Sequence, residues 1–287
     1  MAALKPVRID ERLDEGAPLQ LRLSETLCAN DCAWYHGPRQ YLRALEIVPG
    51  IGRDSRYFAD TLQKLAREGG FSRVLISGSA DCGILAHVSA AYAAAGAALH
   101  ITCVDRCGTP IAMNQWYASS CGVPIDAHQV DVVDFTPKQP FDLVCTHGFL
   151  GWFAPAARRE IVATWRRVLR PGGVVLTASG LRAAVGLTAD ESRSFQARGR
   201  LAHAEAERRF RLDAETIDRW TDRYARRTTA YMPVSIEDVQ TMFAEEGFTF
   251  RELLTVPGPG ATDLARIRIV AERAQRPERA ERERGRP

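Results

Sequence analysis

Small and acidic residues directly follow the first two apolar runs that are typical of buried strands. The segment Gly78–Gly83 (Gly-Ser-Ala-Asp-Cys-Gly) comes after Arg73–Ser77, and Asp105 comes after Leu99–Val104. Small side chains let a ligand approach the backbone closely, and the start of a following helix offers unpaired N–H groups. A carboxylate at the end of the second strand can accept two hydrogen bonds from the hydroxyls of a ribose. A tight turn and a helix N-cap explain the same residues without a ligand.

Three further motifs follow in order along the chain. Asp131 closes a third predicted strand, 126–130, and Phe141–Cys145 is a fourth predicted strand that leads into Thr146 and His147. Imidazole is the side chain used most often as a general base, so His147 could accept a proton at the end of this strand. A histidine that hydrogen-bonds the adjoining backbone is the alternative. The last motif is Leu169–Val175 (Leu-Arg-Pro-Gly-Gly-Val-Val), a helix end and a turn into the next strand.

Helical segments separate these strands. The predicted helices cover 82–95, 110–121 and 154–169, and the fifth strand covers 174–178. Strands and helices that alternate at this length predict a doubly wound, mainly parallel α/β sheet with right-handed crossovers. A sheet of this kind binds ligands at the carboxyl ends of its strands, beside the point where the strand order reverses. The motifs above fall at those ends.

The segments outside this alternation predict helical additions to the sheet. The alternation itself resumes with a helix capped by Ser235 and with two closing strands, 248–256 and 266–271. The last residues are Arg, Glu and Pro with no apolar side chain larger than Ala, which predicts disorder. The expected division is an N-terminal helical cap over 1–70, a core over 71–273 with a helical insertion over 182–231, and a disordered tail over 274–287.

In this order and at these separations, the motifs resemble those of the class I S-adenosylmethionine-dependent methyltransferases. The resemblance covers about 72–181 and resumes from Ser235 through the two closing strands. Its most specific parts are the Leu-Arg-Pro-Gly-Gly element at 169–173 and the Glu-Glu-Gly-Phe ending at 245–248. It implies a Rossmann-like sheet of seven strands and S-adenosyl-L-methionine as the cofactor.

The resemblance also implies roles for individual residues. The glycine loop would pass the methionine part of the cofactor, Asp105 would hold the ribose, and Arg106 would pack against the adenine. Asp131 would accept a hydrogen bond from the adenine amino group, with the Val132 N–H at the ring. The implied cofactor-binding residues are Gly78, Ser79, Ala80, Asp81, Gly83, Asp105, Arg106, Asp131, Val132 and Thr146.

The sequence departs from the family pattern at the glycine loop. The family usually carries an acid two residues before the first loop glycine, where this chain has Ile76. The usual second loop glycine is Ala80 here. We expect Asp81 to supply the missing carboxylate to the ammonium group of the cofactor.

The acceptor side offers three candidate catalytic residues, His147, Tyr35 and His36. Tyr35 and His36 lie in an N-terminal segment that resembling proteins fold over the site, although packing between cap and core explains such aromatic residues equally well. The stretch 146–149 reads Thr-His-Gly-Phe and not the Asn-Pro-Pro-Tyr type that related families use on nucleic acid and protein. The expected reaction is therefore methyl transfer to an oxygen or nitrogen atom of a small molecule. The insertion could select the acceptor or mediate a homodimer.

Composition narrows the class of protein. The 287 residues carry a net charge of +3 with acids interleaved among the arginines, so no nucleic-acid partner is expected. We expect a cytoplasmic protein without a membrane partner, because no secretory signal or long apolar run is present. Seven cysteines suit a reducing compartment. No metal is expected at the pairs Cys28/Cys32 and Cys103/Cys107, because no histidine or further cysteine cluster completes the spacing of a zinc site.

The sequence is also compatible with two other functions. A nicotinamide-dependent oxidoreductase shares the alternating fold, but it would have a fuller glycine pattern and a catalytic Tyr-Lys pair. Lys138 is the only lysine after Lys64 and lies in a polar loop, which argues against that class. A non-catalytic binding module on the same fold is favoured by Ile76.

Overall fold

The protein is described here from a computed structural model, which covers residues 9–29, 31–48, 50–182, 186–228, 231–233, 235–257 and 265–275. The predicted disorder of the tail, apart from residues 274 and 275, therefore lies outside the described residues.

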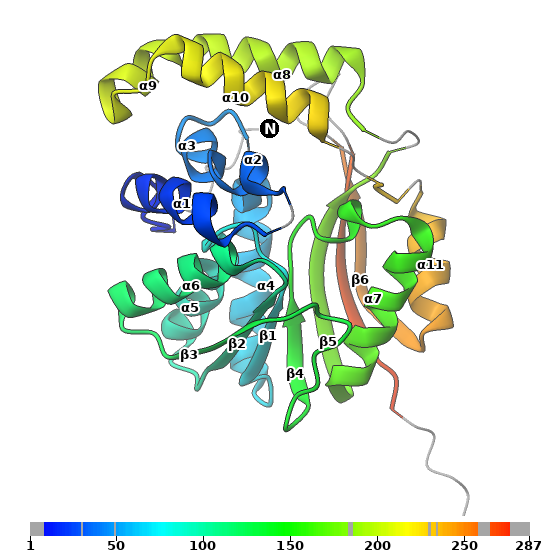
Figure 1. The fold of residues 1–287 in the computed structure, drawn as a ribbon. Helices are drawn as coiled ribbons and strands as arrows, with labels where there is room; N and C mark the ends of the chain where they lie inside the picture. The colour runs from blue at the N-terminus through cyan, green and yellow to red at the C-terminus, as the bar shows by residue number, and fades with distance from the viewer. Residues whose placement is uncertain are drawn as a thin grey trace, which may run out of the picture.

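A seven-stranded sheet forms the centre of the molecule (Figure 1), in the order β3-β2-β1-β4-β5-β7-β6. The strands are β1 (Arg73–Ser77), β2 (His100–Asp105), β3 (Ile125–Gln129), β4 (Phe141–Cys145), β5 (Leu169–Gly180), β6 (Phe248–Val256) and β7 (Arg266–Arg273). The first five strands pair in parallel, and β7 runs antiparallel to both β5 and β6. The strand order reverses between β1 and β4. This arrangement confirms the predicted doubly wound, mainly parallel sheet.

Helices cover both faces of the sheet because the strands carry apolar residues on both sides. Strands β1 and β4 are almost completely buried. One face packs against α4 (Ser55–Glu68), α5 (Gly83–Ala95) and α6 (Gly108–Cys121). The other face packs against α7 (Pro155–Val168) and α11 (Ile236–Glu245). Trp165 is the largest fully buried side chain, and its indole N–H donates to Ser77 Oγ at 2.9 Å.

Strand β5 differs from its prediction at its start. The sequence predicts a helix to Leu169, a turn and a strand from Val174, whereas β5 already begins at Leu169. Phe141 pairs with Leu169 and Leu143 pairs with Val174, so the Pro-Gly-Gly segment forms an irregularity within the strand. Gly172 has a φ of +73°, which a residue with a side chain rarely adopts.

The helical cap and the insertion lie together above the carboxyl ends of the strands (Figure 1). The cap consists of α1 (Leu13–Leu27), α2 (Ala33–His36) and α3 (Arg39–Ala44), followed by the 3-10 turn η1 (Gly50–Asp54). The insertion consists of α8 (Ala189–Leu201), α9 (His203–Phe210) and α10 (Ala214–Arg227). The sequence predicts one long helix over 188–209, but the chain breaks at Ala202.

An apolar core joins the insertion to the cap. Leu42 and Ile47 from the cap are fully buried against Ile217 and Phe195 from the insertion. The insertion is thus a second layer over the cap, which separates it from the sheet. None of the helices in the described ranges is long and apolar enough to cross a membrane.

Candidate functional site

The glycine loop lies at the carboxyl end of β1, beside the point where the strand order reverses. Gly78 has a φ of +71°, and its N–H donates to Val104 O on β2 at 2.9 Å. A Cβ atom at position 78 would collide with the ring of Phe149. Gly83 begins α5, where a Cβ would lie 2.9 Å from carboxylate oxygens of both Asp81 and Glu11. Both glycines therefore allow close approaches that a side chain would prevent.

Asp105 lies opposite this loop at the end of β2. Its two carboxylate oxygens accept hydrogen bonds from the backbone N–H groups of Ser79, at 2.9 Å, and Cys107, at 2.8 Å. Burial raises the pKa of Asp105 to about 6, against the lowering effect of these two hydrogen bonds. Each carboxylate oxygen can accept a further bond, so the group can still bind the hydroxyls of a ligand.

Two buried polar side chains border the same position. Asn114 on α6 donates to Ser79 Oγ at 2.9 Å, while its own Oδ1 has no hydrogen-bond partner among the described residues. Thr146 follows β4 and is fully buried, and its Oγ1 likewise lacks a partner within the described ranges. Buried polar atoms are normally paired, so these two are candidates to meet a ligand.

Asp81 is already engaged by two arginines of the cap. It accepts hydrogen bonds or ion pairs from Arg39 Nε at 3.1 Å, Arg43 Nη1 at 2.8 Å and the Gly83 N–H at 2.8 Å. Burial alone would raise the pKa of Asp81, but the charges of Arg43 and Arg39 outweigh it and the pKa falls to about 2. The predicted contact with a ligand ammonium group thus competes with two resident cations.

Ala80 connects the same loop to α1. The side-chain amide of Gln20 donates to Ala80 O at 3.0 Å and to His36 O at 2.8 Å. Glu11 forms a buried ion pair with Arg43. The cap is therefore fixed to the glycine loop by polar side chains as well as by apolar packing.

The predicted adenine-side residues lie around the ends of β2 and β3. Arg106 is exposed, and Asp131 is half-buried with its Oδ1 3.3 Å from the Val133 N–H. Val132 is buried in the core beneath α7. Asp131 therefore lies on the same edge of the sheet as Asp105, where the resemblance expects it.

His147 belongs to an ionic network on the other side of the strand-order reversal. Its Nε2 lies 2.9 Å from Asp54 Oδ2 and 2.9 Å from Arg266 Nη2. Arg268 Nε contacts the second carboxylate oxygen of Asp54 at 3.0 Å. Burial lowers the pKa of His147, and Arg266 adds to this effect while Asp54 opposes it. His147 is thus neutral near pH 7 and is oriented by Asp54.

Asp54 carries the opposite pKa shift from Asp105. Its side chain is 1% exposed, and burial alone would raise its pKa. The hydrogen bond from His147 and the charges of Arg266 and Arg268 outweigh burial and hold the pKa of Asp54 well below its usual range. The role of Asp54 could not be predicted from the sequence, because its partners are 93 to 214 positions away.

Tyr35 lies in an aromatic cluster formed by three separate parts of the chain. Its ring centroid is 4.9 Å from that of Trp152, in the 3-10 turn η2 (Leu150–Trp152), and 5.8 Å from that of Tyr224 on α10. The guanidinium of Arg39 lies 5.2 Å from the Tyr35 ring centre. Cap, insertion and the turn after β4 therefore meet around Tyr35, on the carboxyl side of the sheet.

His36 packs edge-on against Tyr35, with ring centroids 5.1 Å apart, and also lies against cysteine thiols. Its Nδ1 lies 3.4 Å from the sulfur atoms of both Cys28 and Cys107. Burial lowers the pKa of His36 to about 4, so the imidazole is neutral near pH 7. The structure thus separates His36 from His147, although the sequence analysis grouped both as catalytic candidates. Cys28, Cys32 and Cys107 are residues whose proximity the sequence analysis missed.

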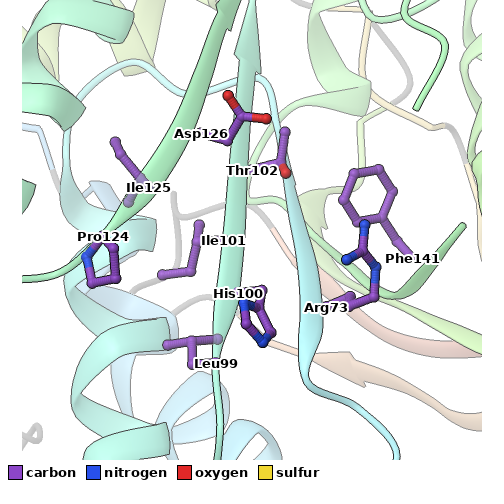
Figure 2. A pocket seen from close by; sticks show the side chains of 9 residues that line it. All are labelled: Arg73, Leu99, His100, Ile101, Thr102, Pro124, Ile125, Asp126 and Phe141. Atoms are coloured by element: carbon purple, nitrogen blue, oxygen red, sulfur yellow. The ribbon is translucent and has the colours of Figure 1, made fainter. Parts of the chain in front are cut away.

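A surface hollow of about 270 Å³ lies at the opposite edge of the sheet. Figure 2 shows its lining, which includes Arg73, His100 and Asp126 at the starts of β1, β2 and β3. Ligands of doubly wound sheets bind at the carboxyl ends of the strands, where Asp105 and the glycine loop lie. We therefore place the functional site at those ends and assign no ligand to this hollow.

Residues 80–173 match the family model described as a methyltransferase domain. No curated protein matches the chain.

Several solved structures share the fold. One is the 1,6-didemethyltoxoflavin-N1-methyltransferase of Burkholderia thailandensis, described with bound 1,6-didemethyltoxoflavin and S-adenosylhomocysteine; it is 16% identical, with a TM-score of 0.53 over 95% of this chain and 94% of that one. The N-methyltransferase NodS of Bradyrhizobium japonicum WM9, in complex with S-adenosylhomocysteine, is 16% identical. Its TM-score is 0.50, and the alignment covers 92% of this chain and 99% of NodS. The mitomycin 7-O-methyltransferase MmcR is 15% identical. Its TM-score is 0.51, and the alignment covers 91% of this chain and 68% of MmcR.

At these identities the structural likeness establishes the fold, while the family model covers residues 80–83 of the glycine loop together with Asp105, Asp131 and Thr146. Residues 80–173 therefore match a methyltransferase domain, and the chain shares its fold with the three methyltransferases described above.

Proposed function

We propose that the protein transfers the methyl group of S-adenosylmethionine to an oxygen or nitrogen atom of a small-molecule acceptor. The observation that carries this proposal is the placement of an aromatic cluster around Tyr35 on the same side of the sheet as the glycine loop and Asp105. The three structural neighbours are described as N- or O-methyltransferases, and two of them are named for small organic acceptors. The proposed acceptor is therefore a small, largely apolar or aromatic molecule.

The residues at the site fit the proposed cofactor. Asp105 would hold the ribose hydroxyls, and Asp131 with the Val132 N–H would meet the adenine. The methionine part would pass along the backbone of the glycine loop, where Gly78 has a positive φ and the Phe149 ring occupies the space that a Cβ would take. The cofactor, when bound, supplies an electrophilic methyl group on a sulfonium leaving group.

The amino-acid end of the cofactor carries one ammonium and one carboxylate. Asp81 and Arg39 offer the complementary pair of charges, 3.1 Å apart, at the tip of the glycine loop. We propose that both contact this end of the cofactor, Asp81 as an anion and Arg39 as a cation. Arg43 and the Gly83 N–H would keep Asp81 in place.

The chain's own part in transfer is to hold the acceptor close and aligned, because the leaving group needs no protein assistance. Tyr35, Trp152 and Tyr224 would form the wall that positions the acceptor. His147 is neutral near pH 7, as a general base must be, and Asp54 fixes its ring. We propose His147 as the base for a hydroxyl acceptor.

Calorimetric titration of the full chain with S-adenosylmethionine, and with NADH as the comparison, tests the cofactor class. We expect binding of S-adenosylmethionine alone. Asp105→Asn removes charged hydrogen bonds of about 1.5–3 kcal/mol each and should weaken binding by about tenfold or more. Asp134→Asn changes an exposed acid in the loop after β3 and should leave binding unaltered. A folded protein that binds only NADH, or neither ligand, would refute the proposal.

An acceptor screen with radiolabelled methyl groups then tests the catalytic step. With a hydroxyl acceptor, His147→Gln should lower kcat by about 10²- to 10⁴-fold with little change in KM. An unchanged kcat would restrict His147 to the ionic network with Asp54.

A further inference from the structure

Three cysteines and one histidine lie together where the cap meets the end of β2. Cys28 follows the end of α1, Cys32 and His36 lie at the two ends of α2, and Cys107 precedes α6. One ligand atom from each, the three Sγ atoms and a ring nitrogen, lies within 4.8 Å of all the others. The group draws on segments more than 70 residues apart in sequence.

The distances agree with a tetrahedral metal site. Cys107 Sγ lies 3.7 Å from the Sγ atoms of both Cys28 and Cys32, and His36 Nδ1 lies 3.4 Å from the Sγ atoms of Cys28 and Cys107. A Zn²⁺ ion about 2.3 Å from each sulfur and about 2.0 Å from nitrogen, at tetrahedral angles, places two sulfurs about 3.8 Å apart and sulfur and nitrogen about 3.5 Å apart. A disulfide would need sulfurs at about 2.05 Å.

The surroundings suit a closed structural site. Cys107 and His36 are buried, and Cys28 and Cys32 are half-buried. The Thr109 hydroxyl lies 3.1 Å from Cys28 Sγ, which places a hydrogen-bonding group next to a thiolate ligand. Four protein ligands complete a tetrahedral shell and leave no open position, which is typical of structural zinc and not of catalytic zinc.

We propose that Cys28, Cys32, His36 and Cys107 bind one Zn²⁺ ion that fastens the cap to the end of β2. Binding three thiols and one neutral imidazole releases three protons to solvent and forms a complex with a net charge of −1. The backbone N–H of Cys107 donates to Asp105, and the His36 carbonyl accepts from Gln20, which also holds Ala80. The metal therefore fixes residues in direct contact with both parts of the cofactor site.

The sequence alone shows only part of this metal site. Cys28, Cys32 and His36 recur at every fourth position, but the fourth ligand comes from after β2. In the sequence Cys107 is paired with Cys103 by spacing, but in the structure Cys103 is buried between the sheet and its helices. Only the fold brings Cys107 to α2, so the expectation that no metal binds rested on an incomplete ligand set.

Metal analysis of the full chain, purified without a histidine tag and under reducing conditions, tests the proposal. We expect one zinc per chain by mass spectrometry. Replacement by Co²⁺ should give the sulfur-to-cobalt charge-transfer and strong visible bands of a tetrahedral thiolate site. A reduced, folded protein that binds neither Zn²⁺ nor Co²⁺, or a Co²⁺ spectrum without thiolate bands, would overturn the proposal.

Two matched variants assign the ligands. Cys107→Ser should lose the metal or bind it at least tenfold more weakly, whereas Cys121→Ser, which alters an exposed cysteine, should keep one zinc. If Cys107→Ser does not fold, the Co²⁺ spectrum of the wild-type chain still tests whether thiolates bind the metal. Equal metal content in the two folded variants would refute the ligand assignment. Removal of the metal by a chelator should weaken S-adenosylmethionine binding. Because the metal content is measured in the absence of S-adenosylmethionine, the test of the metal site does not depend on the proposed function.

Discussion

Two aspartates on either side of the strand-order reversal are buried with different partners, and their pKa values shift in opposite directions. Among the described residues, Asp105 at the end of β2 accepts hydrogen bonds only from backbone N–H groups, and burial raises its pKa to about 6. Asp54 is surrounded by Arg266, Arg268 and His147, which hold its pKa well below its usual range. Asp105 therefore keeps hydrogen-bonding capacity for a ligand, whereas the charge of Asp54 is compensated within the protein. Asp105 is therefore suited to binding a ligand, whereas Asp54 is suited to stabilising the fold and orienting His147.

Replacement of the compensated aspartate should have the largest effect. Asp54→Asn leaves Arg266 and Arg268 without their counter-charge, and loss of one partner of a buried pair costs about 3–5 kcal/mol. The arginine side chains are 17% and 22% exposed, so we expect about 3 kcal/mol of lost unfolding free energy in urea denaturation. Asp60→Asn, in an exposed pair with Arg56, should cost less than about 0.5 kcal/mol. Equal losses in the two variants would show that the network adds no stability.

The glycine loop should be sensitive to side-chain volume as well as to backbone strain. Gly78→Ala combines a positive φ, which costs about 1–2 kcal/mol, with a collision against Phe149. Gly122→Ala has a similar φ of +67° but no heavy atom within 4 Å of the added Cβ. We expect both to lose stability and only Gly78→Ala to weaken S-adenosylmethionine binding by more than about tenfold, as measured by calorimetry. The same affinity in both variants would remove Gly78 from the proposed site.

Acid should destabilise the Asp54 network in two stages. The pKa of His147 is lowered in the folded protein, so its contribution is complete above the unfolded pKa of about 6.5 and is lost as the pH falls below it. The pKa of Asp54 is also lowered, so its contribution is present above about pH 4 and is lost below that value, at about 1.4 kcal/mol for each unit of the shift.

Urea denaturation across pH 3 to 8 measures both stages. Asp54→Asn should abolish the lower stage, and His147→Gln should abolish the upper one. A pH profile of Asp54→Asn that matches the wild type below pH 4 would contradict this assignment.

The contact between cap and glycine loop should show the smallest effect. Gln20→Ala removes hydrogen bonds to His36 O and Ala80 O, and each contributes about 1 kcal/mol on average. We expect about 1–2 kcal/mol of destabilisation together with faster amide exchange at Ala80. Gln63→Ala removes only an exposed hydrogen bond with Arg67 on α4 and serves as the control. An unchanged exchange rate at Ala80 in Gln20→Ala would show that the cap does not order the loop.

The contrast between the two aspartates also explains what the sequence could predict. Asp105 binds the backbone of residues 79 and 107, and a strand followed by a turn places it without knowledge of distant segments. The bounds of β1, β4 and β6 were predicted correctly: β1 and β4 are apolar runs, and β6 lies between Gly247 and Pro257. The position of Asp105, which we propose as a cofactor-binding residue, therefore follows from local sequence order.

Contacts between distant segments could not be predicted in the same way. Asp54 meets side chains that are more than 90 residues away, and His36 meets Cys107 only when the cap lies on β2. The start of β5 was missed because Pro-Gly-Gly is typical of a turn, and pairing with β4 keeps it in the sheet. The roles of Tyr35, His36 and His147 stay predictions.

The distance in sequence between Asp54 and Arg266 has a consequence for synthesis on the ribosome. The two residues are 212 positions apart, and translation at about 5–20 residues per second delays Arg266 by about 10–40 s after Asp54. During that interval a nascent chain that buried Asp54 would hold an uncompensated charge, which is strongly unfavourable. The region around η1 and His147 should therefore be among the last to become ordered during translation, after the glycine loop and β2 have emerged.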